Sequence, residues 1–320
     1  MELTPAEEAL YQRVAARVAE ETAALPRALR ELGAPSLAGL AGGEFSRIAA
    51  LLPRWLAEQA PLADGLCAAL GRAGLYAWWH AEVLDGVLDG ARGVAALPLA
   101  QHALARALDG YAALGLLAGA PWGDLAARLA TATAAYAEEA GARPVDPATV
   151  SDERLAAWTP ALLTDRAAPF GFAVTAHLHL AGVPASDSRW DDLPAAVRCL
   201  TGARQIADDA SDWLDDLRSG QLSWVAAGLI RAFRGSAPAA EGSLERLAGY
   251  ELRAEGFWGE VERAHGELCA QALERLASYG RSRLADLVAA QCRRDGASFA
   301  LMRERRAGLR TLFGAGLDGE

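Results

Sequence analysis

The 320-residue sequence contains no lysine, so all 31 of its basic residues are arginines. Without lysine the chain cannot carry a Walker A phosphate loop, a Schiff-base nucleophile or a lysine general base. Any phosphate group that it binds has to be held by arginine, by backbone N–H groups or by a metal ion. The 41 acidic residues give a net charge of −10, which argues against a nucleic-acid binder, because such proteins rely on a basic surface.

Cysteine is scarce and scattered: the four residues form no CxxC pair, and no histidine stands at zinc-finger spacing from them. We expect reduced thiols in the core, as in a cytoplasmic protein. The N-terminal residues lack the basic start and apolar run of a signal peptide. No window reaches the roughly 18 uninterrupted apolar residues of a membrane-spanning helix. These absences favour a cytoplasmic protein without an integral membrane segment.

β-Branched residues are also uncommon, whereas alanine, leucine, arginine and glutamate dominate, and these are strong helix formers. The sequence therefore predicts an all-α protein. Clusters of Gly, Pro, Ser and Asp divide it into roughly ten helical segments; the breaks are at 33–43, 89–97, 119–123, 141–151, 182–194 and 235–242. None of these connections is long or biased enough to be an interdomain linker, so we expect one domain over residues 1–320.

The most informative stretch is 204–224, RQIADDASDWLDDLRSGQLSW. Asp208, Asp212 and Asp216 are spaced four residues apart, so a helix places their carboxylates in one row, and Arg204 begins that row. Two adjacent aspartates bring the total to five carboxylates within nine residues: Asp209 and Asp215. Like charges at this spacing destabilise a helix. Mg²⁺, which prefers carboxylate, water and phosphate oxygens, would compensate them; a solvated acidic face is the alternative.

Another acidic cluster, the first along the chain, lies in 78–90, WWHAEVLDGVLDG. Asp85 and Asp89 are again four residues apart, and Trp78 and Glu82 precede them on the same helix face. Such a pair is weak evidence by itself, because it occurs on many exposed helices. Helical bundles nevertheless build metal sites from side chains that project inward from facing helices. The two clusters together therefore suggest a metal site.

Between the clusters, an apolar stretch over 165–182 is interrupted by Pro169 and Gly171, which break or kink a helix. Two interpretations stay open. The break directs a helix end at an anion-binding cavity, or it is a simple boundary between two helices.

These residues resemble the class I isoprenoid synthases, the all-helical superfamily of trans-prenyl diphosphate synthases, squalene and phytoene synthases and class I terpene synthases. The run 202–212, GARQIADDASD, is similar to the second aspartate-rich motif of the trans-prenyl diphosphate synthases, and Asp85 and Asp89 look like the first motif. The four-residue spacing of the row over 208–216 also equals that of the metal triad of terpene cyclases. Arg166 stands about where the family places a diphosphate-binding cation.

The resemblance implies an isoprenoid synthase-like bundle of ten or more helices around a central active-site cavity, three Mg²⁺ ions bridging both motifs, and a prenyl diphosphate substrate. It is also compatible with a homodimer. It implies catalytic roles for five metal-binding aspartates: Asp85, Asp89, Asp208, Asp212 and Asp216. Asp209 is a further metal ligand. Residues expected to contact the diphosphate or to form an aromatic wall are Arg166, Arg204, Gln205, Arg293, Arg294, Trp78 and Phe170.

The choice of Arg293 and Arg294 rests on charge. The segment 281–310 carries eight arginines against three acids, in a chain that is acidic overall. Such a segment can close over a diphosphate, and a solvated basic face is the alternative.

Departures from the motifs bear on the reaction. Gly86 occupies the position of the second aspartate of chain-elongating synthases, Arg204 replaces a common Phe, and the lysines that bind isopentenyl diphosphate are absent. We therefore expect a class I terpene synthase or cyclase, a Mg²⁺-dependent lyase that ionises a linear prenyl diphosphate. The alternative is a trans-prenyltransferase, either a prenyl diphosphate synthase or a squalene- or phytoene-type coupling enzyme. A third interpretation is a noncatalytic partner subunit that has kept the fold.

Overall fold

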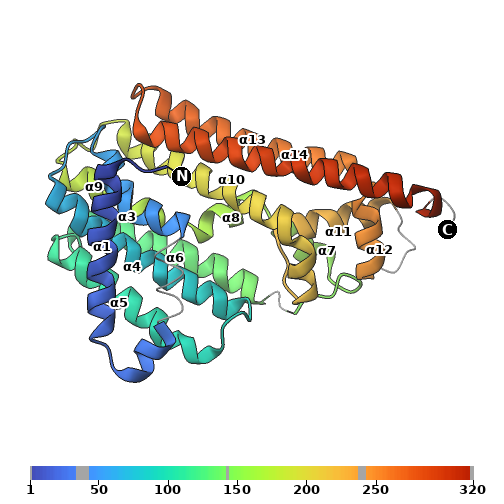
Figure 1. Cartoon of the computed structure of the whole chain (residues 1–320), viewed down its shortest axis with the longest axis horizontal. Helices are drawn as coiled ribbons and strands as arrows, with labels where there is room; N and C mark the ends of the chain where they lie inside the picture. Colours follow the sequence, from blue (N-terminus) through green and yellow to red (C-terminus); the bar gives the residue numbers. More distant parts are fainter. Residues whose placement is uncertain (1, 34–42, 142–143, 237–242, 318–320) are drawn as a thin grey trace. The chain divides into compact units, whose positions relative to one another are not determined.

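The computed structural model describes residues 2–33, 43–141, 144–236 and 243–317 (Figure 1). Within these ranges the chain forms helices and their connections and contains no strand, which confirms the all-α prediction. None of the helices in this part of the chain combines the length and the apolar character needed to cross a membrane. All four cysteines are free thiols; three are buried as expected, whereas Cys292 is only half-buried.

The chain divides into two compact units, and each is described by itself. Unit 1 consists of Met1–Thr131, Ala168–Val197 and Arg275–Leu287, and unit 2 consists of Ala132–Ala167, Arg198–Glu274 and Val288–Glu320. Several long helices contribute residues to both units. The prediction of a single domain over 1–320 stays a prediction.

Unit 1 is organised around one long helix, α4 (Asp64–Leu88). This helix packs against four others: α1 (Pro5–Ala23), α3 (Glu44–Leu56), α5 (Leu97–Ala113) and α9 (Phe170–Leu180). The short 3₁₀ helix η1 (Val94–Ala96) precedes α5. Apolar side chains occupy several faces of α4, which is typical of a helix surrounded by others. Leu70, Trp79 and Val83 are all 0% exposed. Their packing fixes the position of the last turn of α4, which carries the first acidic cluster.

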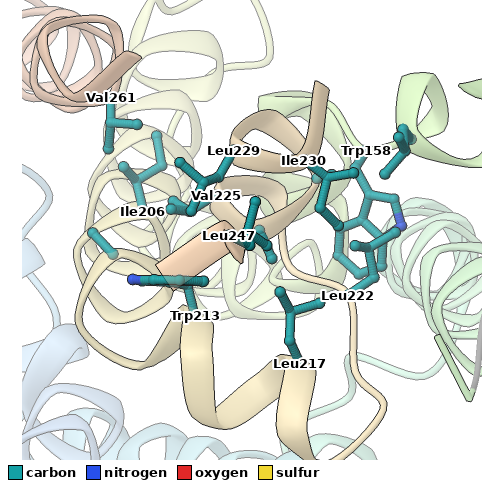
Figure 2. Packing of buried hydrophobic residues seen from close by; sticks show 14 of the residues in the cluster. Trp158, Ile206, Trp213, Leu217, Leu222, Val225, Leu229, Ile230, Leu247 and Val261 are labelled. Atoms are coloured by element: carbon teal, nitrogen blue, oxygen red, sulfur yellow. The ribbon is translucent and has the colours of Figure 1, made fainter. Parts of the chain in front are cut away.

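Unit 2 is built from several helices around one apolar core (Figure 2). The helices that lie in it wholly or in part are α6 (Gly119–Gly141), α7 (Asp152–Ala157), α8 (Pro160–Arg166), α10 (Arg189–Arg218), α11 (Trp224–Ser236), α12 (Leu244–Glu251), α13 (Glu255–Ala277) and α14 (Arg283–Leu317). Helices α13 and α14 run alongside each other and are joined by an ion pair between Glu262 and Arg303 at 2.7 Å. The core is filled by Ile206, Trp213 and Leu217 of α10 together with residues of α11 and α12.

Two helices begin with a serine that caps their first turn. The Ser151 hydroxyl accepts a hydrogen bond from the backbone N–H of Arg154 at the start of α7, at 3.2 Å. Ser243 does the same for Arg246 in α12, at 3.4 Å. These side chains satisfy N–H groups that have no partner within the helix.

The predicted breaks at 89–97 and 141–151 separate successive helices as expected. Two others are displaced. Residues 119–123 form the first turn of α6 instead of a connection, because Pro121 is tolerated where N–H groups lack an intrahelical partner. Helix α10 begins at Arg189, so Pro194 lies inside it. The breaks at 33–43 and 235–242 lie largely outside the described residues.

The interruption between the acidic clusters is a boundary between two helices. Helix α8 ends at Arg166 and α9 begins at Phe170, with Pro169 as its N-cap residue. A side chain at Gly171 would collide with the guanidinium of Arg128. The break is thus a helix boundary, and an anion at the start of α9 stays a prediction.

Candidate functional site

The second acidic cluster, the row of Asp208, Asp212 and Asp216, lies on α10, on the side opposite the core of unit 2. Ile206, Trp213 and Leu217 face the core and are at most 7% exposed (Figure 2). Because a helix turns once every 3.6 residues, this spacing leaves the residues of the row on the other side. Asp212 is exposed, and the other two aspartates of the row, Asp208 and Asp216, are half-buried. The structure thus places the three predicted carboxylates along one side of one helix.

Arg204 lies between two carboxylates. Its Nη2 is 2.7 Å from Oδ1 of Asp208, one turn further along α10. Its Nη1 donates to Oδ1 of Asp295 on α14, at 3.4 Å. Burial raises the pKa of Asp208; the charge of Arg204 lowers it, and that of Asp295 raises it. The row therefore carries its own counter-charge.

Asp295 is a buried carboxylate that the sequence did not point to. Its side chain is 4% exposed. Gln291 donates to its Oδ1 at 2.8 Å, and Nε2 of His265 lies 3.6 Å from its Oδ2. Arg294, a predicted substrate ligand, donates to Oε1 of Gln291. A chain of contacts thus connects Arg294 to the Arg204 guanidinium. Arg293 and Arg294 are both exposed on α14.

Asp209 has a different environment from its neighbour Asp208. It is 4% exposed, and its two oxygens accept hydrogen bonds from the Gln205 amide at 2.9 Å and from the backbone N–H of Trp224 at 3.1 Å. Burial raises its pKa to about 7; Gln205, Arg166 and the Trp224 N–H lower it, and Asp212 raises it. Asp209 and Gln205 thus join α10 to the start of α11. Metal ligation by Asp209 stays a prediction that requires these hydrogen bonds to be exchanged.

The turn after α10 makes this connection possible. Gly220 has a φ of +78°, a conformation that favours glycine because it has no Cβ. Its carbonyl accepts a hydrogen bond from the Val145 N–H at 2.8 Å. The chain then reverses into α11, which brings the Trp224 N–H to Asp209. The glycine-containing loop is therefore part of the scaffold of the motif.

Arg166 lies in unit 2, as does the second acidic row. Its Nη1 is 3.0 Å from Oε2 of Glu139, and its guanidinium lies over the Tyr136 ring at 5.2 Å. Its positive charge lowers the pKa of Asp209. Glu139, which the sequence did not identify, is 4% exposed and supports this arginine from α6.

The first acidic cluster lies at the end of α4, where Asp85 and Asp89 are half-buried. Arg92, in the connection that follows, pairs through Nη2 with Oε1 of Glu82 at 2.9 Å. Its backbone N–H donates to the Gly86 carbonyl at 2.7 Å, and a Cβ at Gly86 would lie 2.9 Å from Cδ of Arg92. Burial raises the pKa of Glu82, and Arg92 lowers it. The Arg92 side chain thus packs where a second aspartate would stand.

An aromatic stack lies two helical turns before Asp85. Trp78 stacks on Phe45 with ring centroids 5.0 Å apart, and it contacts Phe170 in a tilted arrangement at 5.4 Å. All three rings are half-buried, whereas the adjacent Trp79 is 0% exposed in the core. The structure therefore brings together the two predicted aromatic residues and adds Phe45. The sequence could not identify Phe45, because this contact depends on how α3 packs on α4.

No protein-family model matches this chain, and no curated protein matches it in sequence. Two solved structures from Corynebacterium glutamicum match it over nearly its whole length. One is a candidate geranylgeranyl pyrophosphate synthase, with a TM-score of 0.64 and 18% identity over 90% of this chain and 97% of that chain. The other is a geranylgeranyl pyrophosphate synthase complexed with isoprenyl diphosphate and magnesium, with a TM-score of 0.57 and 17% identity, covering 92% and 99%. This chain has the isoprenoid synthase fold.

The fold implied by the sequence motifs is thus confirmed. Both solved structures carry the name of a prenyl diphosphate synthase, which is the branch of the predicted alternative, the trans-prenyltransferase. The terpene cyclase, which Gly86 favoured, has no counterpart in these two names.

The acidic residues of this isoprenoid synthase fold suit Mg²⁺ in their chemistry, because they offer oxygen ligands only. Among the described residues, no three His, Cys, Asp or Glu side chains lie close enough to hold a metal ion by themselves. Mg²⁺ does not require such a cage, since it keeps waters and is bound by one or two carboxylates plus substrate phosphates. In unit 2 the ligands would be Asp208, Asp212 and Asp216, and in unit 1 Asp85 and Asp89.

Proposed function

We propose that this chain is a Mg²⁺-dependent trans-prenyltransferase of the prenyl diphosphate synthase type, which joins an allylic prenyl diphosphate to isopentenyl diphosphate. One observation carries the proposal: an arginine-led row of carboxylates, from Arg204 to Asp216, lies on α10 of a chain with the isoprenoid synthase fold. The isoprenyl diphosphate and magnesium in a structure of the same fold support this substrate class.

In this reaction the C–O bond of the allylic diphosphate breaks, and the diphosphate leaves with the electron pair. The double bond of isopentenyl diphosphate then attacks the allylic cation, and the product loses a proton. Bound Mg²⁺ would act as a Lewis acid that neutralises charge on the leaving diphosphate. In unit 2, Arg166 and Arg204 carry N–H groups that suit the oxygens of the leaving diphosphate. In unit 1, the faces of Trp78 and Phe170 suit a cation or an apolar tail.

A class I terpene synthase is the second candidate, because Arg92 packs over Gly86 and the first cluster lacks a second aspartate. The same ionisation would then be followed by attack of a double bond of the same prenyl substrate on the allylic cation. The cation would finally lose a proton or capture water, which gives a hydrocarbon or an alcohol.

Product analysis separates the candidates. The purified chain is incubated with Mg²⁺ and geranyl, farnesyl or geranylgeranyl diphosphate, each with and without isopentenyl diphosphate. Longer diphosphates that form only with isopentenyl diphosphate support the prenyltransferase. Hydrocarbons or alcohols formed without it support the terpene synthase. If no product forms and no diphosphate is released, the noncatalytic partner subunit becomes the best interpretation. A homodimer also belongs to the proposal, and light scattering during size-exclusion chromatography tests it.

A further inference from the structure

Arg204 contacts two carboxylates that differ greatly in exposure. The side chain of Asp208 is 41% exposed, and that of Asp295 is 4% exposed. The guanidinium uses a different nitrogen for each: Nη2 lies 2.7 Å from Asp208, and Nη1 lies 3.4 Å from Asp295. Because an arginine presents several N–H donors in a fixed plane, one contact can be lost while the other stays.

Asp295 depends strongly on this arginine. A buried carboxylate is costly unless it is paired and hydrogen-bonded. Gln291 provides a hydrogen bond at 2.8 Å, and the His265 ring lies 3.6 Å from the other oxygen. Neither is permanently charged, whereas Arg204 is. Breaking a buried ion pair by removing one partner is strongly destabilising.

Asp208 depends on the arginine much less. Ion pairs at such exposure contribute little to stability, because water can replace the partner. A divalent cation can replace it as well, and it carries twice the charge. Of the two carboxylates that share Arg204, Asp208 is therefore the one that can exchange it.

We infer that Arg204 is the resident counter-ion of Asp208, and that a divalent cation displaces it from Asp208 while Asp295 retains it. Asp295 is then a positioning residue, because it acts on the acidic row through Arg204. The inference rests on the proposed function, since it requires the row to bind a divalent cation. It also gives a physical reason for an arginine at position 204, where it would otherwise compete with the metal.

Titration with Mn²⁺, followed by the electron paramagnetic resonance signal of the free ion, tests this on the full chain. We expect Arg204→Gln to bind Mn²⁺ about fivefold more tightly, because the competing charge is gone. Asp295→Asn is expected to bind about tenfold more weakly, because the guanidinium stays on Asp208. The double variant is expected to match Arg204→Gln, since Asp295 acts through Arg204. A merely structural role of Asp295 would weaken binding in both backgrounds.

The matched control is Arg218→Gln. Arg218 is on the same helix, but its side chain is 62% exposed and it pairs with Asp215, outside the row. Its removal is expected to leave Mn²⁺ affinity unchanged, which separates the local exchange from the general loss of a positive charge. Thermal unfolding in chelator shows which variants fold. Arg204→Gln leaves the buried Asp295 carboxylate without its cation, so it is the variant most at risk of unfolding. If it does not fold, the double variant, which removes both charges, replaces it, and Mn²⁺ binding no tighter than that of the wild type overturns the inference.

The outcomes also separate this inference from the proposed function. A wild-type chain that binds Mn²⁺, with variants that bind it equally well, overturns the inference and leaves the proposed function standing. A wild-type chain that binds no Mn²⁺, with or without inorganic diphosphate, overturns the proposed function and the inference with it.

Discussion

The two acidic clusters obtain their arginine in different ways. In the second cluster Arg204 stands on the same helix as Asp208, and a buried carboxylate of α14, Asp295, holds it from behind. In the first cluster Arg92 follows the end of α4 and packs back over Gly86 toward Glu82. Arg92 therefore fills a position in the motif of the first cluster, whereas Arg204 bridges one carboxylate of the row and another outside it.

The two clusters also differ at the position directly after the leading aspartate, which is Gly86 in the first cluster and Asp209 in the second. At Gly86 the space is taken by Arg92, and at Asp209 the carboxylate is engaged by Gln205 and the start of α11. Neither position offers an unengaged carboxylate beside the leading aspartate. Because Asp208 has an arginine that can be exchanged for a cation, we expect the second cluster to contribute more to metal binding than the first.

The largest expected effect tests this ranking directly. We expect Asp208→Asn to lower the rate of product formation roughly 10³-fold, equivalent to about 4 kcal/mol, because a ligand that stabilises the leaving diphosphate is lost. Asp85→Asn is expected to lower it by roughly 10- to 100-fold. Steady-state rates at saturating Mg²⁺ provide the measurement. An equal or larger loss for Asp85→Asn would break the comparison.

Asp215→Asn is the control for this experiment. Its side chain is 79% exposed and pairs with Arg218, so it changes the same kind of group on the same helix outside the row. We expect its rate to stay close to that of the wild type. If Asp208→Asn also keeps the wild-type product yield in Mg²⁺, the row is not a metal site.

Two adjacent tryptophans test the support of the first cluster. Trp79 is 0% exposed, so Trp79→Ala is expected to lower the free energy of unfolding by about 3 kcal/mol through the cavity that it leaves. Trp78 is half-buried in the aromatic stack, so Trp78→Ala is expected to cost less stability but to change the products, because it removes the central ring. Urea unfolding and product analysis measure the two effects. Equal destabilisation with unchanged products would remove Trp78 from the site.

The pH dependence of stability tests the structural role of Asp209. Its ordinary pKa is 3.8, and burial raises it to about 7. Between these values the folded chain keeps a proton that the unfolded chain has lost, so this group's contribution to the free energy of unfolding falls as the pH rises from about 4 to about 7. Asp209→Asn cannot titrate. The wild type should therefore lose about 3 kcal/mol relative to the variant between pH 4.5 and pH 8.

Urea unfolding at both pH values in chelator measures this difference, and the comparison of wild type with variant cancels the contributions of other groups. A difference that does not change with pH would show that Asp209 titrates normally. The interpretation of its buried hydrogen bonds would then be wrong.

Local periodicity explains what could be predicted from the sequence. The row on α10 follows from a four-residue spacing, and the caps Ser151 and Ser243 act within three residues of their own position. The contact between Arg204 and Asp295 spans 91 residues and depends on which helices pack together. Phe45 was missed for the same reason. No local pattern contains that information.

The adjacent residues Asp208 and Asp209 illustrate the limit more sharply. A rotation of about 100° around the helix axis separates them. Asp208 therefore lies in the row, whereas Asp209 faces the start of α11. The fate of Asp209 then depends on the turn at Gly220, which brings the Trp224 N–H within 3.1 Å. The sequence predicted a cluster of carboxylates. The fold leaves Asp208 in the row beside Arg204 and buries Asp209 in hydrogen bonds that join α10 to α11.

The smallest expected effect concerns Gly86, where the comparison can be sharpened by making the first cluster more like a chain-elongating motif. Gly86→Asp adds a carboxylate, and Gly86→Asn adds the same volume without the charge. Either side chain has to displace Arg92, whose Cδ lies 2.9 Å from the position of the new Cβ, and a flexible side chain can move by that amount. Both variants therefore carry the same cost of displacing Arg92, and any difference between them in Mn²⁺ affinity comes from the charge of the new carboxylate.

We expect Gly86→Asp to bind Mn²⁺ about tenfold more tightly than Gly86→Asn and to form a larger share of elongated diphosphates. Titration with Mn²⁺ and product ratios measure both. If the two variants bind equally, the missing aspartate does not limit the first cluster. The lower contribution of that cluster would then have to come from Glu82 and Arg92, which pair with each other at 2.9 Å and leave less charge available for a cation.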